Sequence, residues 1–227
     1  ARSEWMPANL RPLLAAFPAG QPDAPRRWRL HLLSVDVCAA LGDTDAAIVA
    51  ARAGLAAAPP PDRAEFHRRL GKLYEKRNPL HALNYYNQAA AELADDDPAL
   101  PILLKDRGWL HILQREWPPA AADLARGLAL TRADLPALRA DLLDALASLQ
   151  RNQQHFAAAI DYARQALALR EASGDLLAVA KSLGNLGLHY TGAGAYADAV
   201  AAHREAMDTY RRLGNQEMVA TAWLNIG

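Results

Sequence analysis

The residues Ser182-Leu183-Gly184-Asn185-Leu186-Gly187 are matched 40 positions later by Ala222-Trp223-Leu224-Asn225-Ile226-Gly227. Self-similarity at a period of this size indicates a repeat protein. The small residue that ends each stretch also has counterparts earlier in the chain, at Ser34, Gly71, Gly108 and Ala147, separated by 37, 37 and 39 residues, with 40 more to Gly187. A small residue lets two helices approach closely, so we expect each of these positions to lie where the two helices of a unit touch.

The best-formed unit has the apolar spacing of two helices. Its first helix carries Leu183, Leu186, Gly187 and Tyr190, and its second carries Ala199, His203 and Ala206. This pattern resembles the tetratricopeptide repeat (TPR), with His203 at a position that usually holds an aromatic residue. The 40-residue period resembles the long-helix variety of kinesin light chain and of the sensor ends of bacterial signal-transducing ATPase regulators. The resemblance implies an all-α fold, a right-handed superhelical solenoid of antiparallel helix pairs whose first helices line a concave groove.

The chain divides, on this reading, into two parts. Residues 1–24 do not fit the repeat and are expected to be either an N-terminal cap or the tail of a preceding domain. Residues 25–227 are expected to form the TPR solenoid, with units at about 26–60, 62–97, 99–132, 136–173, 176–213 and an incomplete 216–227. We also expect the sequence to be a fragment of a larger protein.

Composition narrows the classes of function. Lysine plus arginine equals aspartate plus glutamate at 25 each, so overall charge gives no case for nucleic acid or an acidic membrane as a partner. The one cysteine, Cys38, excludes an internal disulfide and favours a reducing, cytoplasmic compartment. No motif for catalysis, a phosphate loop or a metal site is found. We therefore expect a non-enzymatic protein without a cofactor or metal.

Two asparagines are the first candidate for ligand binding. Asn185 and Asn225 each stand two residues before the small residue of their unit. In repeats of the kinesin light chain type, to which this unit is similar, asparagines at this position bind the backbone of an extended peptide. An amide side chain donates and accepts at once, which suits a peptide unit. Lys181 lies in the same first helix and is expected to face the same groove.

A basic group in the second and third units is the other candidate. It consists of Arg68, Arg69, Lys72 and Lys105, with Trp109 nearby in sequence. Arginine presents its donors as a fork that matches carboxylate or phosphate groups. The group therefore predicts an acidic or aromatic-bearing peptide segment as the partner.

Three hypotheses of function remain open at this stage. The first is a non-catalytic scaffold that binds a protein or peptide segment in the concave groove. The second is a sensor arm of a bacterial signal-transducing regulator, working with other domains of the same longer chain. The third is an accessory repeat domain of an enzyme, although the sequence contains no motif that supports it.

Overall fold

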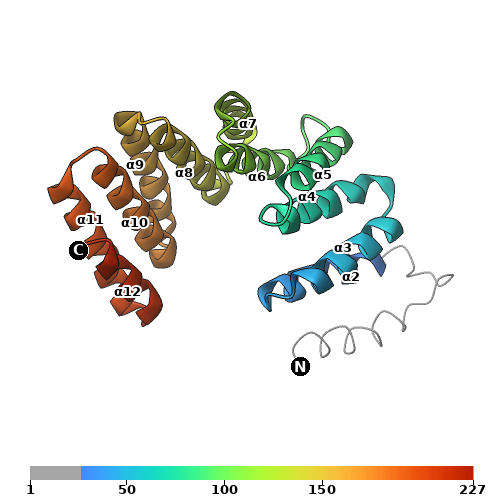
Figure 1. The fold of residues 1–227 in the computed structure, drawn as a ribbon, viewed down its shortest axis with the longest axis horizontal. Coiled ribbons are helices and arrows are strands. Elements are labelled where there is room, and N and C mark those ends of the chain that lie inside the picture. Colours follow the sequence, from blue (N-terminus) through green and yellow to red (C-terminus); the bar gives the residue numbers. More distant parts are fainter. Residues whose placement is uncertain (1–26, 227) are drawn as a thin grey trace. The chain divides into compact units, whose positions relative to one another are not determined.

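The protein is all-helical, as the sequence predicts. The structure, a computed structural model, describes residues 27–226, which contain eleven α-helices and one short 3-10 helix and no strand (Figure 1). The expected cap at residues 1–24 and the small residue Gly227 lie outside the described residues. Within the described part, the chain forms two compact units, one up to Leu103 and one from Leu104 onward.

The first unit is built from two helix pairs. Helix α2 (Arg27–Ala40) packs on α3 (Thr44–Ala57), and α4 (Arg63–Tyr74) packs on α5 (Pro79–Glu92). Helix α3 ends before a run of prolines, which lack the amide donor that a helix needs. The chain is extended at Ala58 and then forms the 3-10 helix η2 (Pro60–Asp62). The core between the pairs contains Trp28, Ile48, Phe66 and Leu70, all buried.

The second unit continues the same pairing. It holds most of α6 (Leu100–Leu113), α7 (Trp117–Leu130), the longer pairs α8 (Pro136–Asn152) with α9 (Phe156–Ser173) and α10 (Leu176–Gly192) with α11 (Tyr196–Arg212), and then α12 (Gln216–Leu224). Helix α9 also packs on α10, and α11 on α12, so that each pair stacks on the next within this unit (Figure 1). The pairwise packing is that of a tetratricopeptide repeat.

The expected small-residue contacts are confirmed at three glycines. A Cβ atom added at Gly71 would lie 2.5 Å from the ring of Tyr86, and one added at Gly187 would lie 2.6 Å from the ring of His203. At Gly108 the nearest atom would be Cγ of Leu124, at 2.8 Å. In each case, the missing side chain leaves room for a large residue of the paired helix, which fills the space.

Four of the turns inside the pairs share one backbone feature, and the turn between α4 and α5 lacks it. Each of the four contains a residue with left-handed φ just before the second helix, and glycine supplies it at Gly42 (φ 76°) and Gly194 (φ 74°). Two other turns place Arg115 (φ 60°) and Gln154 (φ 65°) there, although a residue with a Cβ is strained in this region. The turn geometry is thus kept even where the sequence supplies no glycine.

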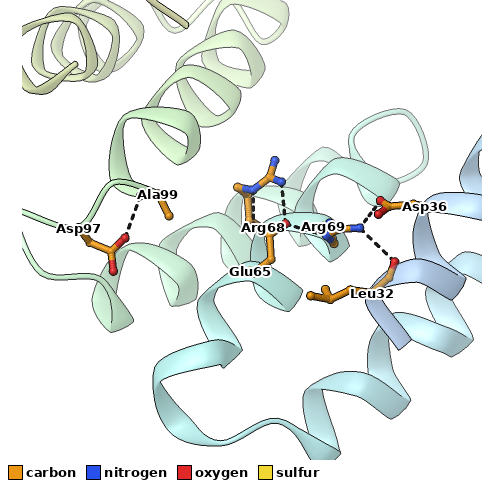
Figure 2. Close-up of polar contacts among 7 residues, drawn as sticks. All are labelled: Leu32, Asp36, Glu65, Arg68, Arg69, Asp97 and Ala99. Carbon is orange, nitrogen blue, oxygen red and sulfur yellow. Dashed lines mark hydrogen bonds and ion pairs between the residues drawn. The ribbon is translucent and has the colours of Figure 1, made fainter. Parts of the chain in front are cut away.

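Side-chain caps define where several helices begin. Asp175 accepts a hydrogen bond from the amide of Ala178 (3.0 Å), and Asn215 accepts one from the amide of Met218 (3.2 Å). Asp97, the last of three consecutive aspartates, accepts one from the amide of Ala99 (2.8 Å) where the chain enters α6 (Figure 2). These carboxylates and amides satisfy amides that have no partner inside the helix. The aspartate run therefore forms the turn and the cap that precede α6.

Replacing Gly187 by leucine should separate α10 from α11, because the new side chain has no space beside His203. We expect Gly187→Leu to lower the free energy of unfolding by about 1–3 kcal/mol, the usual cost of overpacking. The matched control is Gly184→Leu, one turn earlier on α10, where an added Cβ meets nothing within 4 Å. Urea denaturation of both variants measures the difference, and equal stability of the two would contradict the contact.

Candidate functional site

Helices α10, α11 and α12 enclose a groove of about 190 Å³ in the second unit. Its lining comes from all three helices: Lys181, Gly184, Asn185 and Leu188 of α10, His203, Ala206 and Tyr210 of α11, and Met218, Thr221, Ala222 and Asn225 of α12 and its C-terminal end. Apolar and polar groups are mixed in this lining. Such a surface suits a ligand that combines apolar side chains with hydrogen-bonding groups.

Three residues that the sequence singled out lie together in this groove. Lys181 and Asn185 are one helical turn apart on α10, and Asn225 ends α12. All three are exposed. Gly184 lies between Lys181 and Asn185 and has open space where a side chain would be. A ligand in the groove can therefore approach the backbone of α10 at this point.

His203 lines the groove, and its ring also lies beside Gly187, where α10 and α11 meet. It is 1% exposed, and within the described residues neither of its ring nitrogens has a hydrogen-bond partner. Burial lowers the pKa of His203, so its imidazole is neutral at pH 7. A neutral imidazole occupies the space of the usual aromatic ring without bringing a charge to the groove.

A second buried histidine, His189, belongs to α10. Burial, and to a smaller degree the charge of Arg151, lower the pKa of His189 to about 4. Its Nδ1 atom, like the nitrogens of His203, has no hydrogen-bond partner among the described residues. Burial without a hydrogen-bond partner thus favours the neutral form of both imidazoles.

The arginines of the predicted basic group are held by carboxylates of their own unit (Figure 2). Arg68 donates two hydrogen bonds to Glu65 (2.9 Å each). Arg69 donates to Glu65 (2.7 Å), to the carbonyl oxygen of Leu32 (3.2 Å) and to Asp36. Although burial acts to raise it, the pKa of Glu65 is lowered, because Arg68 and Arg69 bond to the carboxylate and attract its charge. Much of the positive charge is thus balanced within the unit.

The remaining members of the group are also in contact with other side chains. Lys72 forms an ion pair with Glu75 (3.1 Å). Lys105 donates to Asp141 of α8 (3.3 Å), and Trp109 packs on the apolar cluster of α7 and α8. Arg68, Arg69 and Lys72 belong to the first compact unit and the other two to the second, so a joint site of all five stays a prediction.

Two ion-pair networks were not predicted from the sequence. Arg107, which stands where the repeat usually has leucine, forms a double hydrogen bond with Asp123 of α7 (2.7 and 2.6 Å). Arg170 of α9 bonds to Asp141 (2.8 Å), Asp144 and Ser182, and so ties α8, α9 and α10 together. Burial raises the pKa of Asp144, and Arg170 opposes this rise. The unusual Arg107 was the only sequence signal for either network.

The described residues show neither a metal-binding group nor a membrane-spanning segment. No three of their His, Cys, Asp and Glu side chains gather in a way that could hold a metal ion. None of the helices between residues 27 and 226 is both long and apolar enough to cross a bilayer.

Comparison with known proteins supports the class of protein that this geometry defines. A family model of the tetratricopeptide repeat matches residues 179–213. No curated protein matches the sequence. Among solved structures, BtubC (BKLC) of P. vanneervenii has a TM-score of 0.75 at 18% identity, over 91% of this chain and 87% of that one.

Two further structures share the fold. One is a signal-transduction ATPase with numerous domains (STAND) of Pyrococcus horikoshii that has a tetratricopeptide repeat sensor, with a TM-score of 0.75 and 16% identity over 89% of this chain but 34% of that one. The other is a putative kinesin light chain repeat protein of Podospora anserina, with a TM-score of 0.68 and 15% identity over 86% and 99% of the two chains.

Stacked helix pairs, with a glycine at the contact inside three of them, define an α-helical repeat protein. One unit matches the tetratricopeptide repeat family model, and the fold of most of the chain is shared with solved structures of tetratricopeptide repeats.

Buried histidines whose ring nitrogens have no hydrogen-bond partner, His189 above all, should make stability depend on pH. In the unfolded chain, His189 has the ordinary pKa of 6.5 and is protonated below that pH. In the folded protein, the same side chain stays neutral down to about pH 4. Stability from this group is therefore complete above pH 6.5 and decreases by about 3 kcal/mol as the pH falls to 4.

We expect His189→Gln to lose less stability than the wild type over this interval, because glutamine does not titrate. Urea denaturation at pH 7.5 and pH 4.5 gives the two differences. Buried carboxylates contribute equally to both proteins, so the comparison isolates the histidine. An equal loss of stability in the two proteins would contradict the effect.

Proposed function

We propose that the protein is a non-catalytic scaffold that binds an extended segment of a partner protein in the groove formed by α10, α11 and α12. The observation that carries this proposal is the position of Asn185 and Asn225, exposed at equivalent places of successive units and lining the same groove. Asparagine amides spaced along a groove can bond to successive peptide units of an extended chain, because each one both donates and accepts.

The lining also indicates which side chains the partner segment carries. Lys181, one turn from Asn185, attracts a carboxylate, and Leu188 and Met218 offer apolar contact. The segment is thus expected to be acidic, with at least one apolar side chain. Tetratricopeptide repeats typically have no catalytic role, which agrees with the absence of any catalytic motif from this sequence. A cytoplasmic setting, with a single reduced cysteine, is part of the same proposal.

Capture of peptides from a labelled random library tests the groove. We expect Asn185→Ala and Asn225→Ala each to weaken retention by about 2–10-fold, the effect of one lost hydrogen bond of about 0.5–1.5 kcal/mol. Gly184→Leu should abolish retention without loss of stability, because its side chain enters the groove where space is open. Lys181→Glu should select against acidic peptides.

The control is Asn84→Ala, which removes an exposed asparagine of α5 outside the groove. Its retention should equal that of the wild type. If the wild type, the four groove variants and the control retain the library equally, the groove is not the binding surface.

A second candidate function is the sensing arm of a larger regulator. The likeness to the repeat sensor of the STAND protein supports it, since that fold extends over 89% of this chain. In this role, the groove would bind an inducing partner and pass the signal to other domains of the same chain. The sequence of the complete gene tests this role: an encoded phosphate-binding loop of the Walker type supports it, and a gene without one excludes it.

A further inference from the structure

The groove has a counterpart one unit earlier in the chain, between α8, α9 and α10. These three helices begin at Pro136, Phe156 and Leu176, each 40 positions before the start of α10, α11 and α12. Stacked repeats place equivalent residues alike, so the two places can be compared residue by residue.

An arginine of the protein itself occupies the earlier place. Arg170 of α9 donates hydrogen bonds to Asp141 (2.8 Å) and Asp144 of α8, and to the hydroxyl group of Ser182 on α10. The side chain of Arg170 is only 12% exposed. The space between the three helices is thus filled by a guanidinium group that is held by two carboxylates and a hydroxyl group.

All four residues of this arrangement are replaced in the groove. Forty positions on, the places of Asp141, Asp144, Arg170 and Ser182 hold Lys181, Gly184, Tyr210 and Ala222. All four replacements line the groove. Glycine and alanine therefore leave open a space that polar side chains fill one unit earlier, and the groove has no guanidinium group of its own.

The replacement also reverses the charge. The lining contains no acidic residue, and burial lowers the pKa of His203 and raises the pKa of Tyr210, so both are uncharged at pH 7. Lys181 is thus the one charged side chain of the lining, and within residues 27–226 it forms no ion pair. The complement of this place is therefore an anionic group, whereas the earlier place holds a cation.

We propose that the groove binds one glutamate side chain of the partner segment, in the place that Arg170 occupies one unit earlier. This inference rests on the proposed function and adds the residue that the groove selects. The carboxylate of the glutamate bonds to Lys181. Its methylene groups lie against the small buried residues Ala206 and Ala222.

The spacing on α10 favours glutamate over aspartate. Lys181 and Asn185 are four residues apart, which is about 6 Å along the helix. When Asn185 holds the peptide backbone, the carboxylate of glutamate comes nearer to Lys181, because its side chain is one methylene group longer than that of aspartate.

Sequencing of the peptides that the protein retains from the labelled random library tests this inference. For the wild type, we expect glutamate at one position about threefold more often than glutamine, the effect of one exposed ion pair. Glutamate should also be more frequent than aspartate at that position. Lys181→Gln should remove the preference for glutamate over glutamine, while retention through the two asparagines persists.

The matched control is Arg204→Gln, because Arg204 is an exposed cation of α11 that does not line the groove. This variant should select glutamate as the wild type does. Loss of the preference in both variants would assign it to the general charge of the unit and would overturn the glutamate site.

A second variant gives the groove an occupant of its own. It combines the four substitutions that restore the residues of the earlier place, Lys181→Asp, Gly184→Asp, Tyr210→Arg and Ala222→Ser. We expect unchanged helical circular dichroism and at least about tenfold less retention of the library, because the new guanidinium group excludes the ligand. Retention by the folded variant at the level of the wild type would contradict the proposal.

The glutamate site and the proposed function fail in different ways. If Asn185→Ala and Asn225→Ala leave retention unchanged, the groove does not bind a segment and both are wrong. If retention depends on these asparagines but glutamate is not enriched, or stays enriched in Lys181→Gln, the function stands and the glutamate site is wrong. Stronger enrichment of aspartate than of glutamate would also overturn this site.

Discussion

The close approach of paired helices at one small residue is the constraint on which this structure depends. Gly71, Gly108 and Gly187 each leave the space that a large side chain of the next helix fills, and those side chains are Tyr86, Leu124 and His203. A glycine also makes room for a large side chain between successive helix pairs, where the ring of Phe66 lies against Gly54. Since interiors are packed as densely as crystals, the glycine and its partner fix the distance between the helices.

The groove is a consequence of that spacing. Once α10 is held against α11 through Gly187 and His203, α12 stacks on α11 and leaves a trough between the three helices. His203 shapes its base, and burial keeps the imidazole uncharged. Lys181, Asn185 and Asn225 are the exposed polar groups of this trough that the sequence singled out, and apolar side chains such as Leu188 and Met218 lie beside them.

Charge in this protein serves mainly to join helices. Arg69 links α4 to α2 through Asp36 and the carbonyl of Leu32, and Arg170 links three helices of the second unit. An arginine that the sequence suggests as a ligand-binding residue can instead form such an ion pair within the protein. Partly buried pairs of this kind hold their partners in fixed positions, since removal of either member leaves the other uncompensated.

The sequence by itself determined the helical repeat, because the period of small residues and the apolar spacing are properties of order along the chain. It also predicted that Asn185 and Asn225 lie on one side of successive units, since equivalent positions of stacked units face the same way. The two asparagines and Lys181 do line one groove, and their role in binding stays a prediction. Only the tertiary structure decided that Arg69 reaches Asp36 and the carbonyl oxygen of Leu32, that Arg107 pairs with Asp123, and that the leucine before Ser34 is exposed while Leu70, Leu146 and Leu186 are buried. Those outcomes depend on which side chains meet across helices, and the distance between two such groups in space is not set by their separation in sequence.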